Sequence, residues 1–214
     1  MLVKKWIVDL CLGFVKVTGF LPAQLFLKPR VHLSGSARRK LPRPCILISN
    51  HVSLMDFVLY LLVFPLRTIR FLMAEVLFQK GKLFGTFLHV IGGIRVNRQE
   101  KEFGFIPQSI EILDRGGTLG IFPQGRLPVG GETVPFTVST AVIALHADAP
   151  LVPVYTDGNY GLFKRANVVI GEPFYMPSVD QGDPKQLEEA TEFLQKKVYE
   201  LKAQLDQRIT ANGK

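Results

Sequence analysis

A polar turn between two apolar segments constrains the fold of this 214-residue chain more than any other feature. Cys45–Ser49 is short, apolar and partly β-branched, which predicts a buried strand. Phe57–Phe64 is apolar throughout and stops before Pro65, which predicts a buried helix. The seven residues between them, Asn50–Asp56, therefore form a strand-to-helix turn.

His51 and Asp56 lie five positions apart in this turn. In a turn that enters a helix, Asp56 can reach back to the imidazole, fix its tautomer and leave the other ring nitrogen free as a base. There are structural alternatives. Ser53 or Asn50 caps the helix, Asp56 favours its positive end, and His51 is a buried histidine with satisfied hydrogen bonds. Taken alone, the His-x4-Asp spacing favours these structural interpretations.

Three further segments follow in the same chain: Gly92–Arg98, Phe122–Arg126 and Val152–Val154. With the N-H-x4-D pattern of Asn50–Asp56, their content and order resemble the four blocks of the glycerolipid acyltransferases, the family of the 1-acyl-sn-glycerol-3-phosphate (lysophosphatidic acid) acyltransferases. The resemblance covers residues 45–155.

The resemblance implies an enzyme that moves a fatty acyl group from acyl-CoA or acyl carrier protein to the hydroxyl of a lysophospholipid. The default acceptor is 1-acylglycerol-3-phosphate, which would give phosphatidic acid. His51 would take the hydroxyl proton, and Asp56 would orient His51 and stabilise the imidazolium. Because the acceptor hydroxyl is the nucleophile, the absence of a G-x-S-x-G motif agrees with this chemistry.

Arginine grips phosphate with two hydrogen bonds, so Arg95 and Arg98 are candidates to hold the acceptor phosphate. Arg98 is the better match to the arginine of the family's second block, and the alternative is surface charge beside a strand. Glycines of the second and third blocks would allow a tight turn or a close approach to ligand. The expected substrate-binding residues are Asn50, Gly93, Arg95, Arg98, Gln124, Gly125 and Arg126.

The third block departs from the family's usual F-P-E-G-T-R. Gln124 replaces the glutamate, and the threonine is missing, so that Arg126 directly follows Gly125. Glutamine keeps the size and hydrogen-bonding capacity of glutamate but loses its charge. The departure therefore puts the acceptor in doubt more than the reaction.

The chain's net charge of +8 lies entirely before the catalytic turn. Residues 1–55 hold nine Lys or Arg and one acid, Asp9, whereas the remainder is neutral. A basic and apolar segment favours an anionic membrane surface, where each nearby cation adds about 1 kcal/mol of attraction. Nucleic acid is the competing partner, but the chain carries no binding motif for it.

Apolar residues at helical spacing predict a helix over residues 2–20, and a second short helix follows Pro22 up to residue 27. The segment lacks a run of about 18 uncharged apolar residues, so it is not expected to span a bilayer. An interfacial pair of amphipathic helices and packing on the protein's own core are equally open. The resemblance favours the membrane, since many members carry an N-terminal helical anchor. We expect residues 1–27 to associate with the cytoplasmic face of a membrane and residues 28–214 to form the catalytic domain.

Strands and helices alternate along the chain, which predicts an α/β fold with a layered mixed sheet flanked by helices. The predicted strands are 45–49, 67–73, 118–122, 151–155 and 168–170, with 28–44 as a loop or edge strand. The predicted helices are 57–64, 75–88 with breaks at Gly81 and Gly85, 100–115 broken near Pro107, 133–147, and 184–209.

Cys11 and Cys45 have no C-x-x-C partner, so we expect reduced structural thiols. No motif indicates a metal or a cofactor beyond the thioester co-substrate. Three other functions stay open: the same reaction on another lysolipid, amino-acid lipid or glycolipid; a catalytically silent lipid-binding protein; and a thioester hydrolase.

Overall fold

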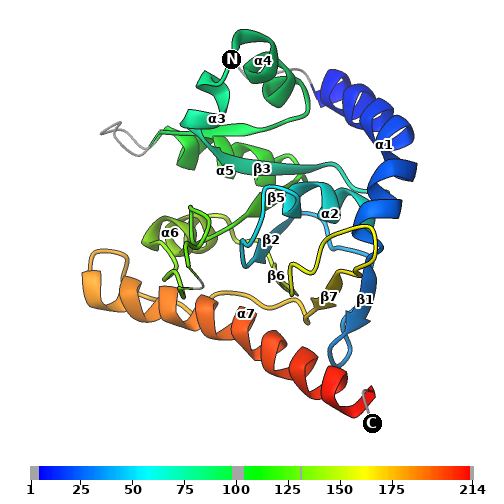
Figure 1. Cartoon of the computed structure of the whole chain (residues 1–214). Helices are drawn as coiled ribbons and strands as arrows, with labels where there is room; N and C mark the ends of the chain where they lie inside the picture. The colour runs from blue at the N-terminus through cyan, green and yellow to red at the C-terminus, as the bar shows by residue number, and fades with distance from the viewer. Residues whose placement is uncertain (1–4, 98–103, 131, 213–214) are drawn as a thin grey trace.

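A seven-stranded mixed sheet forms the centre of the computed structural model, which describes residues 5–97, 104–130 and 132–212 (Figure 1). The strand order is β1-β7-β6-β2-β5-β3-β4, with β6 and β7 antiparallel and the other neighbours parallel. This confirms the predicted mixed sheet. The strands are β1 Arg30–Leu33, β2 Cys45–Ser49, β3 Ile69–Ala74, β4 Ile94–Val96, β5 Thr118–Ile121, β6 Leu151–Thr156 and β7 Asn167–Ile170.

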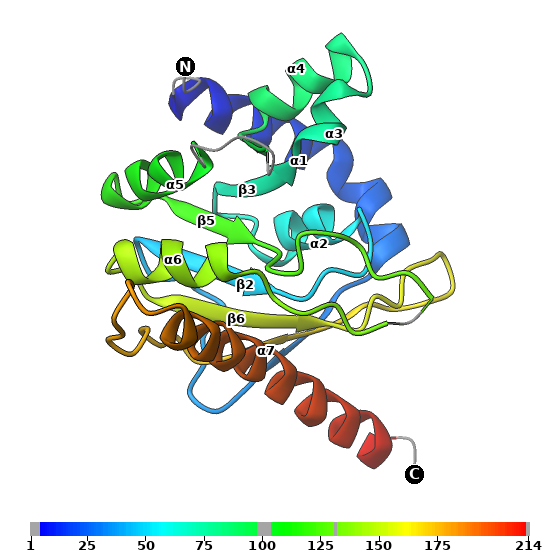
Figure 2. The ribbon, with the colours of Figure 1, turned by 90° about the vertical axis from the view of Figure 1, so that its left-hand side faces the viewer.

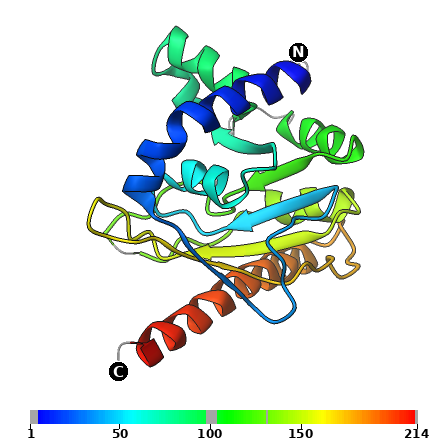
Figure 3. The ribbon, with the colours of Figure 1, turned by 90° about the vertical axis from the view of Figure 1, so that its right-hand side faces the viewer.

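Helices cover both faces of the sheet, because alternate residues of each strand point to opposite sides. Ile46 and Ile48 of β2 pack in the core under α5, α6 and α7, whereas Cys45 and Leu47 pack in the core under α1 and α2. Figure 2 shows α5, α6 and α7 along one side, and Figure 3 shows α1 and α2 on the other. The helices are α1 Lys5–Leu27, α2 Asp56–Val63, α3 Glu75–Gln79, α4 Lys82–Val90, α5 Phe105–Asp114, α6 Val138–His146 and α7 Pro184–Asn212.

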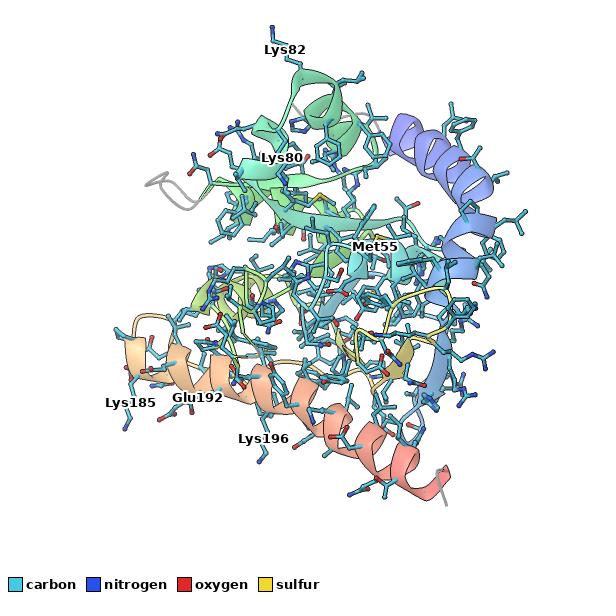
Figure 4. The ribbon with its side chains drawn as sticks, viewed as in Figure 1. Met55, Lys80, Lys82, Lys185, Glu192 and Lys196 are labelled. Carbon is cyan, nitrogen blue, oxygen red and sulfur yellow. The ribbon has the colours of Figure 1, made fainter. Side chains whose placement is uncertain are left out.

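The long helix α7 is amphipathic, as its sequence predicts. Its apolar side packs on the sheet through Leu194, Val198 and neighbouring residues. Figure 4 shows charged side chains of its outer side, among them Lys185 and Lys196, pointing away from the sheet. The helix therefore closes one face of the core and leaves its polar side in solvent.

Several boundaries differ from the sequence prediction. One helix, α1, replaces the two predicted around Pro22, because a proline removes only one helical hydrogen bond and its helix can continue. Gly85 lies inside α4, where a side chain would collide with the carbonyl of Phe78, so it serves close packing and breaks nothing. Pro107 lies in the first turn of α5, where proline is tolerated.

Two further differences concern the sheet and α6. The segment 133–137 precedes α6 and is not helical. Strand β4 was not predicted, since three residues are too few to give a periodic pattern. The edge strand suggested within residues 28–44 is confirmed as β1, which pairs with β7.

Parallel pairing brings three of the four segments that resemble the family's blocks to one edge of the sheet. The turn of Asn50–Asp56 follows β2, the third block follows β5, and the fourth block lies on β6. Since β2 pairs in parallel with both β5 and β6, the carboxyl ends of all three strands meet. We call this the catalytic edge.

Leu194→Ala tests how strongly α7 is anchored. The Leu194 side chain is fully buried, so truncation should lower the free energy of unfolding by about 2–5 kcal/mol. Ile209→Ala, on an exposed part of the same helix, should change it by less than about 0.5 kcal/mol. Urea denaturation of both variants checks this, and equal losses would contradict the packing described.

Candidate active site

The Asp56 carboxylate is the most heavily bonded group at the catalytic edge, and it is completely buried. Its Oδ2 accepts hydrogen bonds from the backbone N–H groups of Val52 at 2.7 Å and Ser53 at 3.0 Å. The same oxygen lies 2.8 Å from Nδ1 of His51. Oδ1 accepts a short hydrogen bond from the Tyr160 hydroxyl. Four donors therefore hold this carboxylate, so its charge is stabilised without water.

This arrangement sets the tautomer of His51. The carboxylate can only accept, so Nδ1 carries the proton and Nε2 keeps a free lone pair. The imidazole also stacks on the ring of Phe122, with centroids 4.2 Å apart and planes 16° apart. Phe122 directly follows β5, so the two neighbouring strands β2 and β5 together orient the ring. The arrangement matches that of a general base held by an acid.

Of the structural alternatives for the turn, Asp56 does lie in the first turn of α2, whereas neither Ser53 nor Asn50 is the cap. The N-cap position of α2 is Met55, labelled in Figure 4, and no side chain caps it. Ser53 instead accepts the backbone N–H of Met55 at 3.1 Å, which tightens the turn. This hydrogen bond agrees with a role of the Ser53 hydroxyl in the turn.

Asn50 joins the ends of two strands. Its amide donates to the backbone carbonyl of Thr156 at 2.8 Å and accepts the Thr156 N–H at 2.9 Å. The side chain is buried. This two-way bond holds the turn after β2 against the end of β6, so the geometry gives Asn50 a structural role, and its contact with substrate stays a prediction.

An apolar cavity of about 540 Å³ opens beside the catalytic pair. It lies between the ends of β3, β4 and β5 and the helices α5 and α6, and Phe122 lines it while stacking on His51. Its volume is in the range of small-molecule sites. The other lining residues are Leu72, Met73, Ala74, Val96, Phe105, Ile106, Ile121, Gly125, Thr137, Val138, Ser139, Thr140 and Val142.

Both described arginine candidates are engaged in ion pairs. Arg95, on β4, lies 3.1 Å from Glu75, which begins α3. Arg126 pairs with Glu132 through both guanidinium NH₂ groups. These hydrogen bonds lower the pKa of Glu132 to about 2, so this pair is ionised at neutral pH. An incoming phosphate would therefore have to displace Glu75 from Arg95 or Glu132 from Arg126.

Arg95 also lies far across the sheet from His51. Its strand, β4, is three positions from β2 in the sheet, which corresponds to about 14 Å at the usual strand spacing. The third candidate, Arg98, falls outside the described residues. Of the two arginines predicted from the second block, the structure therefore describes only Arg95, which pairs with Glu75 and not with the His51–Asp56 pair.

Comparison with known protein families gives a match over the part of the chain that holds this site. The family described as Acyltransferase matches residues 30–157, more than half of the chain. The chain belongs to the acyltransferase family. The match begins at β1 and ends directly after β6, so it spans every strand that forms the catalytic edge.

Individual acyltransferases agree with this assignment. The chain is 33% identical over 145 residues to the 1-acyl-sn-glycerol-3-phosphate acyltransferase of Bacillus subtilis, covering 65% of this chain and 71% of that protein. It is 27% identical over 128 residues to human 1-acyl-sn-glycerol-3-phosphate acyltransferase beta, covering 58% of this chain and 45% of the human protein. The chain thus spans less than half of the human enzyme.

A solved acyltransferase shares the fold. The crystal structure of the 1-acyl-sn-glycerophosphate acyltransferase of Thermotoga maritima superposes with a TM-score of 0.63 at 24% identity. The match covers 93% of this chain and 81% of that one. At this identity the likeness shows the shared fold, the sheet and its helices, and says nothing of the site residues.

The glutamine that departs from the acyltransferase pattern has a defined contact. The side-chain oxygen of Gln124 accepts the backbone N–H of His51, and the residue is only 4% exposed. This bond ties the third block, after β5, to the catalytic turn. A neutral amide oxygen meets this need as a carboxylate would. Gly125 follows with φ of 66°, a conformation that favours glycine, and lines the cavity.

Gly93 is explained by packing. A side chain at this position would approach the carbonyl of Leu88 at 2.9 Å and the sulfur of Met73 at 3.0 Å. The glycine therefore allows the end of α4 to lie close against β3. The close approach expected at this position is to the protein's own backbone, and no ligand is needed to explain it.

Tyr160 is the site residue that the sequence prediction missed. It lies in the loop after β6, 104 positions from the aspartate that it contacts. Burial and the negative charge of Asp56 raise the pKa of the Tyr160 hydroxyl, so it stays protonated and donates. No local pattern in the sequence indicated it, because the contact depends on which strands are neighbours in the sheet.

Gln124→Glu and Gln124→Leu separate the charge of this position from its hydrogen bond. Leucine cannot accept the His51 N–H, so the turnover number should fall about tenfold or more. Glutamate can accept it and should keep activity within a few-fold. Steady-state kinetics on folded protein measures both variants, and equal losses would show that the hydrogen bond is not what this position supplies.

Proposed function

We propose that this acyltransferase moves a fatty acyl group from a thioester, acyl-CoA or acyl carrier protein, to the free hydroxyl of 1-acylglycerol-3-phosphate. The observation that carries the proposal is the buried Asp56 carboxylate, which lies 2.8 Å from Nδ1 of His51 and leaves Nε2 outside this contact. The relatives from Bacillus subtilis and human are 1-acyl-sn-glycerol-3-phosphate acyltransferases, which supports this acceptor.

In this mechanism Nε2 of His51 takes the proton of the acceptor hydroxyl as the oxygen bonds to the thioester carbonyl carbon. Asp56 stabilises the imidazolium that forms. When the tetrahedral intermediate collapses, the carbon–sulfur bond breaks and the imidazolium returns its proton to the leaving thiolate. No covalent enzyme intermediate is needed, because the acceptor hydroxyl is the nucleophile.

The apolar cavity is the proposed site of the donor's acyl chain. It begins at Phe122, which stacks on the catalytic ring, and its walls are predominantly aliphatic and aromatic. Burial of acyl methylenes there contributes roughly 0.8 kcal/mol each. A chain seated in the cavity would have its carbonyl end close to His51, which is where attack must occur.

The acceptor phosphate would be held by arginine. Arg126 is the last residue of the third block, and its side chain is half exposed. Its partner Glu132 is also exposed, so a phosphate could replace Glu132 at little cost in free energy. Arg95 would contribute only to a ligand that extends across three strands. Arg126 is therefore the first arginine to test for acceptor affinity, and Arg98 keeps the role that the family resemblance implies.

The enzyme is proposed to work at the surface of an anionic membrane, through α1. The helix exposes one apolar stripe at helical spacing, and no helix among the described residues is long and apolar enough to cross a bilayer. Such a surface helix would place the enzyme on the cytoplasmic face, peripheral or monotopic. The exposed residues of the stripe are Leu10, Phe14, Val17, Leu21 and Leu25.

His51→Ala is the direct test of the reaction. With labelled acyl-CoA or acyl carrier protein and a panel of lysolipids in liposomes, wild type should esterify 1-acylglycerol-3-phosphate. The variant should lose at least about a thousandfold in rate, since it lacks the base. Asp56→Asn should also be strongly impaired, because an amide cannot hold the same tautomer.

The other outcomes of this assay assign the rival functions. Ester on a different lipid from wild type alone would correct the acceptor and keep the mechanism. Free fatty acid without any ester would identify a thioester hydrolase. No product from folded wild type with either donor would contradict the enzyme and leave a lipid-binding protein.

Val96→Phe tests the cavity. Val96 is partly buried and lines the cavity at β4, so a larger side chain should shorten the space for an acyl chain. The preference among donors should shift toward shorter chains, seen as the ratio of kcat/KM for short and long acyl thioesters. An unchanged ratio would place the donor chain elsewhere.

A further inference from the structure

We propose that the loop between β6 and β7, residues 157–166, is a second membrane-contacting element, which inserts Leu162 and Phe163 into an anionic bilayer and is linked to the catalytic acid through Tyr160. The inference rests on the proposed function, because it names how that site meets its membrane. We call this segment the β6–β7 loop.

The tip of the β6–β7 loop presents apolar side chains to solvent without any cover. Phe163 is 101% exposed and Leu162 is 60% exposed. Burying a phenylalanine in an apolar medium is favourable by about 1.5–3 kcal/mol relative to leaving it in water, so complete exposure of its ring needs an explanation. A partner with an apolar interior supplies one.

The charges beside this tip identify the partner. Lys164 and Arg165 follow the tip directly and are exposed. Lys28, at the end of α1, donates its ammonium hydrogen bond to the carbonyl of Leu162. The loop's acid, Asp157, is bonded internally to Asn167. Apolar side chains bordered by cations match a bilayer with anionic headgroups.

The loop is also continuous with the exposed apolar stripe of α1. The N–H of Gly161 donates to the carbonyl of Phe26 at 3.2 Å, and that of Ala166 donates to Leu27 at 3.0 Å. Figures 1 and 3 both show the loop, in yellow, beside the C-terminal end of α1, in blue. Both elements can therefore meet the same bilayer surface.

The same loop contacts the catalytic turn at two points. The Tyr160 hydroxyl donates to Asp56, and Gly158 packs on Val52 so closely that a side chain would approach it at 2.5 Å. Gly158 has φ of 67°, which favours glycine at this approach. Tyr160 is thus a positioning residue, and lipid contact at the tip would fix the loop that holds the catalytic acid.

The experiment uses the full chain and vesicles of equal parts phosphatidylcholine and phosphatidylglycerol. Phe163→Cys in a Cys11→Ser background carries an environment-sensitive thiol dye. Burial raises the pKa of the remaining thiol, Cys45, to about 11, so it stays unlabelled at neutral pH. We expect a blue shift of the dye emission on vesicles. An unchanged spectrum on vesicles that bind the protein would overturn the proposal.

Variants without a label test the binding contribution. Leu162→Ser/Phe163→Ser should partition to these vesicles about tenfold more weakly or worse. The matched control, Ile209→Ser, removes an exposed apolar side chain of α7 and should change binding less than about twofold. Equal binding of the double variant and wild type would overturn the inserted tip, and so would an equal loss in the control.

Kinetics then separate this inference from the proposed function. The double variant should lose turnover on vesicle-borne acceptor but keep it within about twofold on a monomeric short-chain acceptor. Tyr160→Phe should bind vesicles normally and show a kcat about tenfold lower with an unchanged KM for the acceptor. An unchanged kcat would overturn the link through Tyr160. A dye shift in the labelled Phe163→Cys variant, together with no acyl transfer by the wild type, would refute the function and keep the membrane contact.

Discussion

The buried negative charge of Asp56 is the constraint on which the catalytic edge depends. A carboxylate without water is tolerated only when donors surround it, and here they come from two parts of the chain, the turn after β2 and the β6–β7 loop. Two are backbone N–H groups of the turn after β2, one is the His51 ring, and one is the hydroxyl of Tyr160 in the β6–β7 loop. The turn, the loop and the strands that carry them must therefore be correctly assembled before the catalytic ring is oriented.

The local parts of this assembly could be predicted from the sequence, whereas the long-range parts could not. His51 and Asp56 share one short turn, so their spacing allowed the contact seen in the structure, although the resemblance of the four blocks was needed to favour it. The contact of Tyr160 depends on strand order, which no local pattern reveals. The ion pair of Arg95 was missed for the same reason, because Glu75 lies on a different element.

Gln124 shows that a motif residue can change while a hydrogen bond at its position is present, here the bond to the backbone N–H of His51. The residue lies at the end of β5, beside β2, and its oxygen faces the backbone N–H of His51. That donor is neutral, so a neutral acceptor satisfies it, and the glutamine adds no second negative charge beside the buried carboxylate. In this chain a negative charge at position 124 is therefore not needed to hold the backbone of His51.

Phe122 connects His51 with the apolar cavity. Its ring stacks on His51 and also forms a wall of the apolar cavity, on the side of α5 and α6. Asp56 contacts the edge of the same ring at Nδ1, and Tyr160 links Asp56 to the β6–β7 loop, which is hydrogen-bonded to the end of α1. If the donor chain fills the cavity, the acceptor would approach from the side of α1 and the β6–β7 loop, where the exposed apolar residues lie. A lipid acceptor could then reach His51 from the bilayer without leaving it completely, and transfer would need only its hydroxyl to enter the site.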